Sequence, residues 1–200
     1  MNKLIAVALL CCLNLAPAAF AADSYRVDVL VFRFLGPPDE SGTQFSSGLP
    51  NSTIELTDNQ GLQAAGIKIL PQEQFGLNPE WASLRASAQF RPLIKLAWIQ
   101  KQPPEKNGPS LRIKSGESFV VNTGEFSTQE VYEIDGRVGL AKSRYLHLEA
   151  DLTYTLADAG GVRSWRLNER RRLRRDELHH LDSPKLGLLV RVNRAGSNTP

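Results

Sequence analysis

The sequence predicts an α+β fold in which strands dominate: a mostly antiparallel sheet with one or two helices packed on one face. Apolar and polar residues alternate without error through residues 145–156, which indicates a strand with one face on the core and one toward water. Turn-forming residues separate such segments at short intervals, as in antiparallel hairpins. One segment, residues 79–91, carries a helix signal. A ferredoxin-like core with a long C-terminal hairpin is compatible with this order.

The N-terminus has the features of a cleavable signal peptide over residues 1–21. Lys3 supplies a positive charge, and residues 4–15 form an apolar stretch that is too short to span a bilayer. Ala19 and Ala21 give the small-x-small pattern of a cleavage site. We therefore expect export across the inner membrane of a Gram-negative bacterium to the periplasm, and no integral membrane segment after cleavage.

Both cysteines, Cys11 and Cys12, lie inside this apolar stretch. We expect a mature chain without thiols, and therefore without disulfides or Cys-ligated metals. Lys and Arg number 24 against 21 Asp and Glu, so the distribution of charge matters more than its total. The length predicts a single domain over residues 22–194, followed by a disordered tail over residues 195–200.

The expected elements follow from turn signals and periodicity. A first strand over residues 25–34 ends at Gly36-Pro37-Pro38. Residues 37–80 are rich in Gly, Pro, Ser and Asn and predict mostly loop, with one short ordered piece at 67–70. A helix begins at Pro79 and must end before Pro92. Further extended segments are expected at 92–100, 111–113, 119–122, 136–140, 145–156, 165–178 and 188–192, with a mildly acidic loop or sheet edge at 125–135.

Residues 163–175 are unusual because they hold seven arginines. On a regular strand, alternate side chains lie about 7 Å apart on one face. The arginines of that outward row are Arg166, Arg170, Arg172 and Arg174. Arg171 and Arg175 would share the inward parity with apolar residues, unless a bulge near Arg171 or an end of the sheet relieves the misfit.

Two interpretations of the arginine row stay open. In one, Glu149 and Asp151 face outward on a neighbouring strand and pair with the arginines across it. In the other, the row recognises an anionic partner, because arginine forks match carboxylates and phosphates. An exported protein meets little nucleic acid, so the periplasmic candidates are peptidoglycan carboxylates, lipid headgroups and acidic proteins. The candidate ligand-binding residues are Arg166, Arg170, Arg172, Arg174 and His179.

Catalytic signatures are missing from the sequence. It contains no G-x-S-x-G, P-loop or H-E-x-x-H motif. His179 and His180 are adjacent, so on a strand they face opposite ways and do not easily share one metal. We predict a protein that is not an enzyme and has no metal or cofactor. The alternative is a periplasmic metal-dependent hydrolase that uses His147, His179 and Asp182.

Three blocks of the chain resemble the CsiV family of periplasmic peptidoglycan-binding proteins. They are YRVDVLVF at 25–32, RYLHLEADL at 144–152 and RRLRRDELHHLDSP at 171–184, in this order. The motif residues, to which we assign a structural role, are Arg144, Tyr145, His147, Glu177, Asp182 and Pro184.

The resemblance implies a non-catalytic periplasmic protein that binds peptidoglycan. It further implies an accessory factor of cell-wall synthesis, and thereby of cell shape, that acts with LpoA, the lipoprotein activator of a bifunctional peptidoglycan synthase. It supplies no residue-level binding site. A protein-only adaptor that never touches the glycan is a further alternative.

Overall fold

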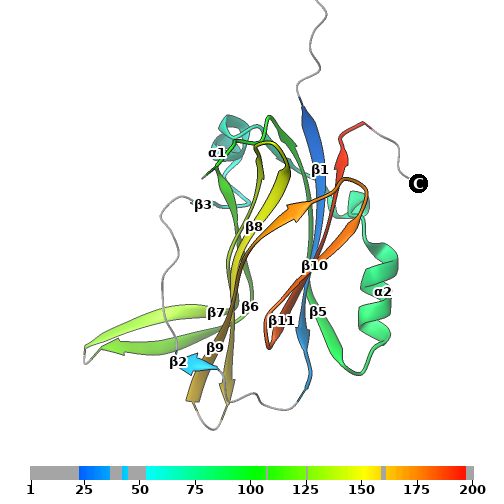
Figure 1. The fold of residues 1–200 in the computed structure, drawn as a ribbon. Coiled ribbons are helices and arrows are strands. Elements are labelled where there is room, and N and C mark those ends of the chain that lie inside the picture. Colours follow the sequence, from blue (N-terminus) through cyan, green and yellow to red (C-terminus); the bar gives the residue numbers. More distant parts are fainter. Residues whose placement is uncertain are drawn as a thin grey trace, which may run out of the picture.

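The computed structural model describes residues 23–36, 42–44, 53–106, 108–124, 126–158 and 161–196. The predicted signal peptide with both cysteines and the end of the predicted tail lie outside these residues. Two sheets pack face to face around a shared apolar core, and a helix covers the outer face of one of them (Figure 1).

The first sheet has the strand order β10-β11-β1-β5-β4. Its strands are β1 (Ser24–Phe34), β4 (Ile67–Ile69), β5 (Phe90–Lys101), β10 (Leu178–Asp182) and β11 (Leu186–Arg194). All of its described pairings are antiparallel.

The second sheet has the order β2-β9-β8-β7-β6-β3. Its strands are β2 (Thr43–Gln44), β3 (Thr53–Ile54), β6 (Ser110–Gly124), β7 (Ser127–Lys142), β8 (Leu146–Asp158) and β9 (Gly161–Leu173). Its pairings are antiparallel except for the short parallel pair β3–β6. The β6–β7 hairpin extends beyond the rest of the molecule (Figure 1).

The core lies between the sheets, and strand alternation explains its composition. On β1, Val27, Val29 and Val31 point between the sheets and are at most 1% exposed. Leu148 and Leu152 of β8 meet them from the second sheet and are fully buried. Each such side chain contributes about 1.5–3 kcal/mol by leaving water. The period-two prediction for the apolar face of β8 is therefore confirmed.

Helices are few and short. They are α1 (Asn59–Ala64), the 3-10 turn η1 (Gln72–Gln74) and α2 (Asn78–Ala86). Pro79 lies in the first turn of α2, as predicted, and the helix ends before Ser87. Leu84 of this helix and Leu77 just before it pack against Leu30 and Phe32, which point outward from β1 and form a second apolar cluster.

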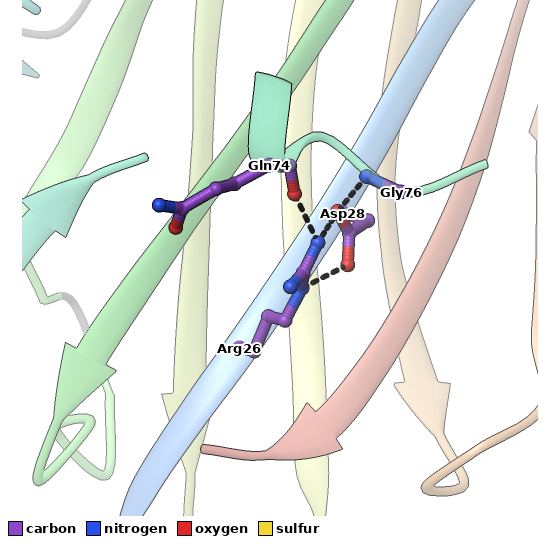
Figure 2. A network of polar contacts seen from close by, with 4 residues as sticks. All are labelled: Arg26, Asp28, Gln74 and Gly76. Atoms are coloured by element: carbon purple, nitrogen blue, oxygen red, sulfur yellow. Dashed lines mark hydrogen bonds and ion pairs between the residues drawn. The ribbon is translucent and has the colours of Figure 1, made fainter. Parts of the chain in front are cut away.

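A polar network holds the segment before α2 against the outer face of β1 (Figure 2). The Asp28 carboxylate accepts two hydrogen bonds from the Arg26 guanidinium, at 2.8 and 3.0 Å, and one from the Gly76 amide at 2.7 Å. Arg26 also donates to the carbonyl oxygen of Gln74. The hydrogen bonds to Asp28 raise the pKa of Arg26. The network therefore ties η1 and its following turn to the sheet.

The mostly antiparallel, α+β prediction is consistent with this architecture, but the ferredoxin-like core is not confirmed. The strands divide between two sheets. β1 pairs with β5 and β11, two strands that lie far from it in the sequence. The predicted long C-terminal hairpin is not confirmed either, since β10 and β11 pair over five residues and the longer hairpin is β8–β9. Alternation defines the two faces of a strand, but not which strands become neighbours.

Several element boundaries also differ from the expected ones. The two short pieces at 111–113 and 119–122 belong to the single strand β6. Residues 127–135 belong to β7, and their first part pairs with β6 alone, so the sheet-edge alternative holds there. Within residues 37–80, the expected ordered piece coincides with β4, and α1 and η1 are additional elements.

Candidate functional site

The arginines of β9 divide into a paired group and a group at the strand end. β8 and β9 pair without a register shift, so the predicted outward parity holds for Arg166, Arg170 and Arg172, whereas Arg174 lies beyond the strand, which ends at Leu173. Arg166 donates to both oxygens of Asp151, at 2.6 and 2.8 Å, and Arg170 Nε lies 3.4 Å from Glu149. The hydrogen bonds to Asp151 raise the pKa of Arg166. The cross-strand pairing that the sequence allows is thus present for these two arginines.

The polar face of β8 is less exposed to solvent than the sequence predicts. Asp151 is only 7% exposed and also lies 3.8 Å from Arg137 Nε of β7. Thr155 is 1% exposed and shares a hydrogen bond of 3.1 Å with Ser164. Neighbouring strands on both sides cover this face with long or hydrogen-bonding side chains, which period-two alternation does not reveal.

Arg171 and Arg175, the two misfits of parity, are accommodated without a bulge. β9 ends at Leu173, so Arg175 lies in the following turn. Arg171 lies within the strand, 2.9 Å from Glu169 on the same face, and donates to the carbonyl oxygen of His180 at 3.3 Å. Its side chain stays 45% exposed. Arg175 therefore avoids the apolar face because the strand ends before it. Arg171 stays on that face, where an ion pair with Glu169 accommodates its charge.

The end of β9 presents arginines to a different environment. Arg172 Cζ lies 3.4 Å from the ring centroid of Tyr145, and Arg144 Cζ lies 5.4 Å from the same centroid. Arg174 is 73% exposed and lies 3.7 Å from Glu177. His179 Nε2 lies 3.0 Å from the Arg174 backbone amide, which donates to it and so joins β10 to the end of β9.

Arg144, Tyr145, Arg172 and Arg174 line a cavity of about 400 Å³ at one end of the two sheets, whereas His179, a predicted ligand-binding residue, is not among its lining residues. The cavity is lined by Tyr25, Lys142, Arg144, Tyr145, Leu146, Arg172, Leu173, Arg174, Arg175 and Arg194. The lining residues come from the start of β1, the β7–β8 turn, the end of β9 and the end of β11. We call this feature the cationic cavity.

Positive charge exceeds negative charge around the cationic cavity. Asp23 contacts Lys142 and lies 3.8 Å from Arg194, and Glu177 lies beside Arg174. Arg144, Arg172 and Arg175 form no ion pair with a carboxylate of the residues that the structure describes. Unneutralised guanidinium groups at a partly enclosed surface favour an anionic ligand, since each presents a planar fork of N–H donors that matches a carboxylate.

The structure brings together some of the predicted site residues and separates others. Arg172 and Arg174 line the cationic cavity, whereas Arg166 and Arg170 lie further along β9 beside their carboxylate partners. Arg144 and Tyr145, to which we assigned a structural role, line it as well.

No pattern in the sequence pointed to the other cations of the cavity. Lys142 and Arg194 lie far apart in the chain, and neither belongs to a run of basic residues like that of 163–175. They meet only because β7 and β11 end on the same side of the two sheets.

The predicted structural motif residues lie at both ends of the sheets. Arg144, Tyr145 and His147 lie at the cavity end, whereas Asp182 and Pro184 lie at the other end of β11, opposite Arg194. His147 Nδ1 lies 3.0 Å from the carbonyl oxygen of Tyr145, within the turn that leads into β8. Asp182 ends β10, and the turn that follows it through Pro184 is closed by Ser183, whose amide donates to the Leu186 carbonyl oxygen at 2.8 Å.

The residues of the alternative metal site belong to different sheets. His147 lies on β8, whereas His179 and Asp182 lie on β10. Across the described ranges of the chain, no group of three or more His, Cys, Asp or Glu side chains is placed to hold a metal ion. The described residues also contain no helix that is both long and apolar enough to cross a bilayer.

Comparison with known protein families finds a match over nearly the whole chain. The family model described as "Peptidoglycan-binding protein, CsiV" matches residues 4–195, nearly the whole chain. No curated protein and no solved structure matches. Membership of a peptidoglycan-binding family is consistent with a location in the cell envelope. The extent of the match shows that this chain belongs to the CsiV family of peptidoglycan-binding proteins.

Proposed function

We propose that this protein is a non-catalytic periplasmic accessory factor of cell-wall synthesis that binds peptidoglycan and acts with LpoA, the activator of a bifunctional peptidoglycan synthase. The observation that carries the binding part is the cationic cavity, on a chain whose family binds a polymer that bears carboxylates. The predicted signal peptide supports the periplasmic location. The link to LpoA and to cell shape rests on the sequence resemblance.

Sedimentation with purified sacculi tests the binding part. The mature chain from residue 22 onward should pellet with sacculi at low salt and stay in the supernatant without them. Binding should weaken as salt is raised, because ions screen exposed charges beyond about 8–10 Å at 0.1–0.15 M ionic strength. Absence of co-sedimentation at low salt would contradict the proposal.

A parallel pull-down with purified LpoA tests the accessory role. Retention of LpoA on the immobilised mature chain, together with sacculus binding, is the expected result. Retention of LpoA without sacculus binding would indicate a protein-only adaptor instead. Release of soluble muropeptides from sacculi that are incubated with the protein would contradict the non-catalytic assignment.

A further inference from the structure

We propose that the cationic cavity binds the free carboxylates of the peptidoglycan stem peptide and not the glycan, with Arg144, Arg172 and Arg175 as the contacting cations. This inference rests on the proposed function and adds to it the chemical class that the cavity recognises. Three features of the cavity support it: its charge, the state of its two aromatic rings and its size.

The charge of the cavity is available to a ligand. Lys142 and Arg194 already contact Asp23, and Arg174 lies beside Glu177. The three remaining guanidinium groups have no carboxylate partner within the described part of the chain. Arg144 lies in the β7–β8 turn, whereas Arg172 and Arg175 lie at the end of β9 and in the turn directly after it, so two backbone segments supply these cations.

Arg172 is held in place for such a contact. Its Cζ lies 3.4 Å from the ring centroid of Tyr145, a cation–π contact. Stacking of a guanidinium on a ring leaves the N–H donors at its edge free to bind a carboxylate. The contact thus fixes the side chain without consuming its hydrogen-bonding capacity, which lowers the entropy lost on binding.

A cation lies against each of the two aromatic rings of the cavity. Tyr145 has Arg172 over its ring, with Arg144 Cζ at 5.4 Å. Tyr25 is only 3% exposed, and Lys142 Nζ lies 5.5 Å from its ring centroid. Tyr145 is 37% exposed. A sugar that stacks on the Tyr145 face carrying Arg172 would have to displace that guanidinium, and one that stacks on Tyr25 would have to open the core.

Within peptidoglycan, the stem peptide is the part that bears the anionic groups that such a cavity can bind. The glycan strand consists of N-acetylated sugars, and its lactyl carboxyl groups are blocked by amide bonds to the stem peptides. The free carboxylates of the polymer are on the stem peptides, both along the peptide and at its C-terminus. A volume of about 400 Å³ lies within the range of roughly 300–1,000 Å³ that is usual for sites that bind small molecules.

Soluble probes can separate the two parts of the polymer. Isothermal titration calorimetry of the mature chain would use three ligands: the tetrapeptide L-Ala-γ-D-Glu-meso-diaminopimelyl-D-Ala, the same peptide with its carboxylates amidated, and the neutral tetramer of N-acetylglucosamine. We expect binding of the tetrapeptide, at least about tenfold weaker binding of the amidated peptide, and no binding of the sugar. Tenfold corresponds to about 1.4 kcal/mol, the scale of one charge-assisted contact.

Charge-reversal variants locate the contact. Arg172→Glu and Arg175→Glu, made separately, should each weaken tetrapeptide binding by about tenfold or more. Arg85→Glu is the matched control, because Arg85 is an exposed arginine in the last turn of α2 and does not line the cavity. Unchanged thermal unfolding of all three variants would show that the fold is intact. Arg175 lies in an exposed turn, so its variant tests the proposal even if Arg172→Glu proves unstable.

The outcomes distinguish this inference from the proposed function. Wild-type protein that pellets with sacculi, but binds the amidated peptide as well as the tetrapeptide or binds only the sugar, would overturn the inference and leave peptidoglycan binding in place. Absence of pelleting would remove the proposed function itself. Binding to phosphatidylglycerol vesicles that is lost in Arg172→Glu, without tetrapeptide binding, would assign the cavity to lipid headgroups and also overturn the inference.

Discussion

A substitution of Asp151 can distinguish a structural from a ligand-binding role for the part of the arginine row around Arg166. Its carboxylate accepts two hydrogen bonds from Arg166 and lies 3.8 Å from Arg137 Nε. The Asp151 side chain is 9% exposed, whereas that of Arg166 is 55% exposed. We therefore predict that Asp151→Ala destabilises the protein but leaves peptidoglycan binding by the folded protein unchanged.

The magnitude follows from the two partners. A pair about 4 Å apart near a protein surface interacts by about 4 kcal/mol at an effective dielectric constant of 20. Loss of Asp151 leaves Arg137 Nε, a buried donor, without a counter-charge, but it also removes the cost of burying the carboxylate. Arg166 regains water when it is released, so its share is below about 1 kcal/mol. We expect a net loss of about 2–3 kcal/mol in the free energy of unfolding.

Urea unfolding, monitored by tryptophan fluorescence, measures this loss. A thermal scan should show a Tm lower by about 4–12 °C, at about 2–4 °C per kcal/mol for a chain of this size. Glu130→Ala is the matched control, because Glu130 is an exposed carboxylate on β7, and it should change stability by less than about 0.5 kcal/mol. A loss below about 1 kcal/mol for Asp151→Ala would refute the estimate. Unchanged stability with loss of sacculus binding would assign a ligand role to this part of the row.

Three further predictions concern the fold that supports the cavity. Tyr154→Phe should lower the free energy of unfolding by about 1–2 kcal/mol near neutral pH, because Arg33 of β1 loses the hydroxyl that accepts its hydrogen bond. Burial raises the pKa of Tyr154 above its ordinary 10.0. The stability that the neutral phenol contributes is therefore complete below pH 10 and is lost as the pH rises through the folded-state pKa. In denaturant titrations, the difference in the free energy of unfolding between wild type and variant should shrink above pH 10. In a double-mutant cycle with Arg26→Ala and Asp28→Ala, we expect a coupling of at least about 1 kcal/mol, and additive losses would contradict the network. Gly136→Ala should lower the free energy of unfolding by about 3 kcal/mol, because the new Cβ would lie 2.2 Å from the Asp151 carbonyl oxygen of β8. Gly36→Ala is the control, because a Cβ at Gly36 meets nothing within 4 Å. Equal unfolding midpoints for the two variants would show that β7 and β8 do not pack so closely.

Much of the secondary structure could be predicted from local sequence. The strand at 25–34, the helix that begins near Pro79 and the apolar face of β8 all follow from periodicity and turn residues, and the structure contains them. The division into two sheets could not be predicted in this way. It depends on pairings such as β1 with β11, whose residues lie more than one hundred and fifty positions apart in the chain.

The candidate site shows the same division between local and distant information. Alternation correctly placed Arg166, Arg170 and Arg172 on one face of β9, and the charge pattern indicated Glu149 and Asp151 as partners, which they are for Arg170 and Arg166. Alternation gave no means of telling the neutralised arginines from the available ones. That difference depends on where β8 supplies carboxylates and where β9 ends.

The sequence by itself determined the class of the fold, the family, and the concentration of arginine in one strand, because these depend on residue types and their local spacing. Only the tertiary structure decided which charges remain available. Lys142, Arg144, Arg175 and Arg194 meet at one end of the sheets because strands that are distant in sequence end there together. Electrostatic neutralisation depends on separations of a few ångströms between such groups, so it is a property of the folded arrangement and not of the order of residues.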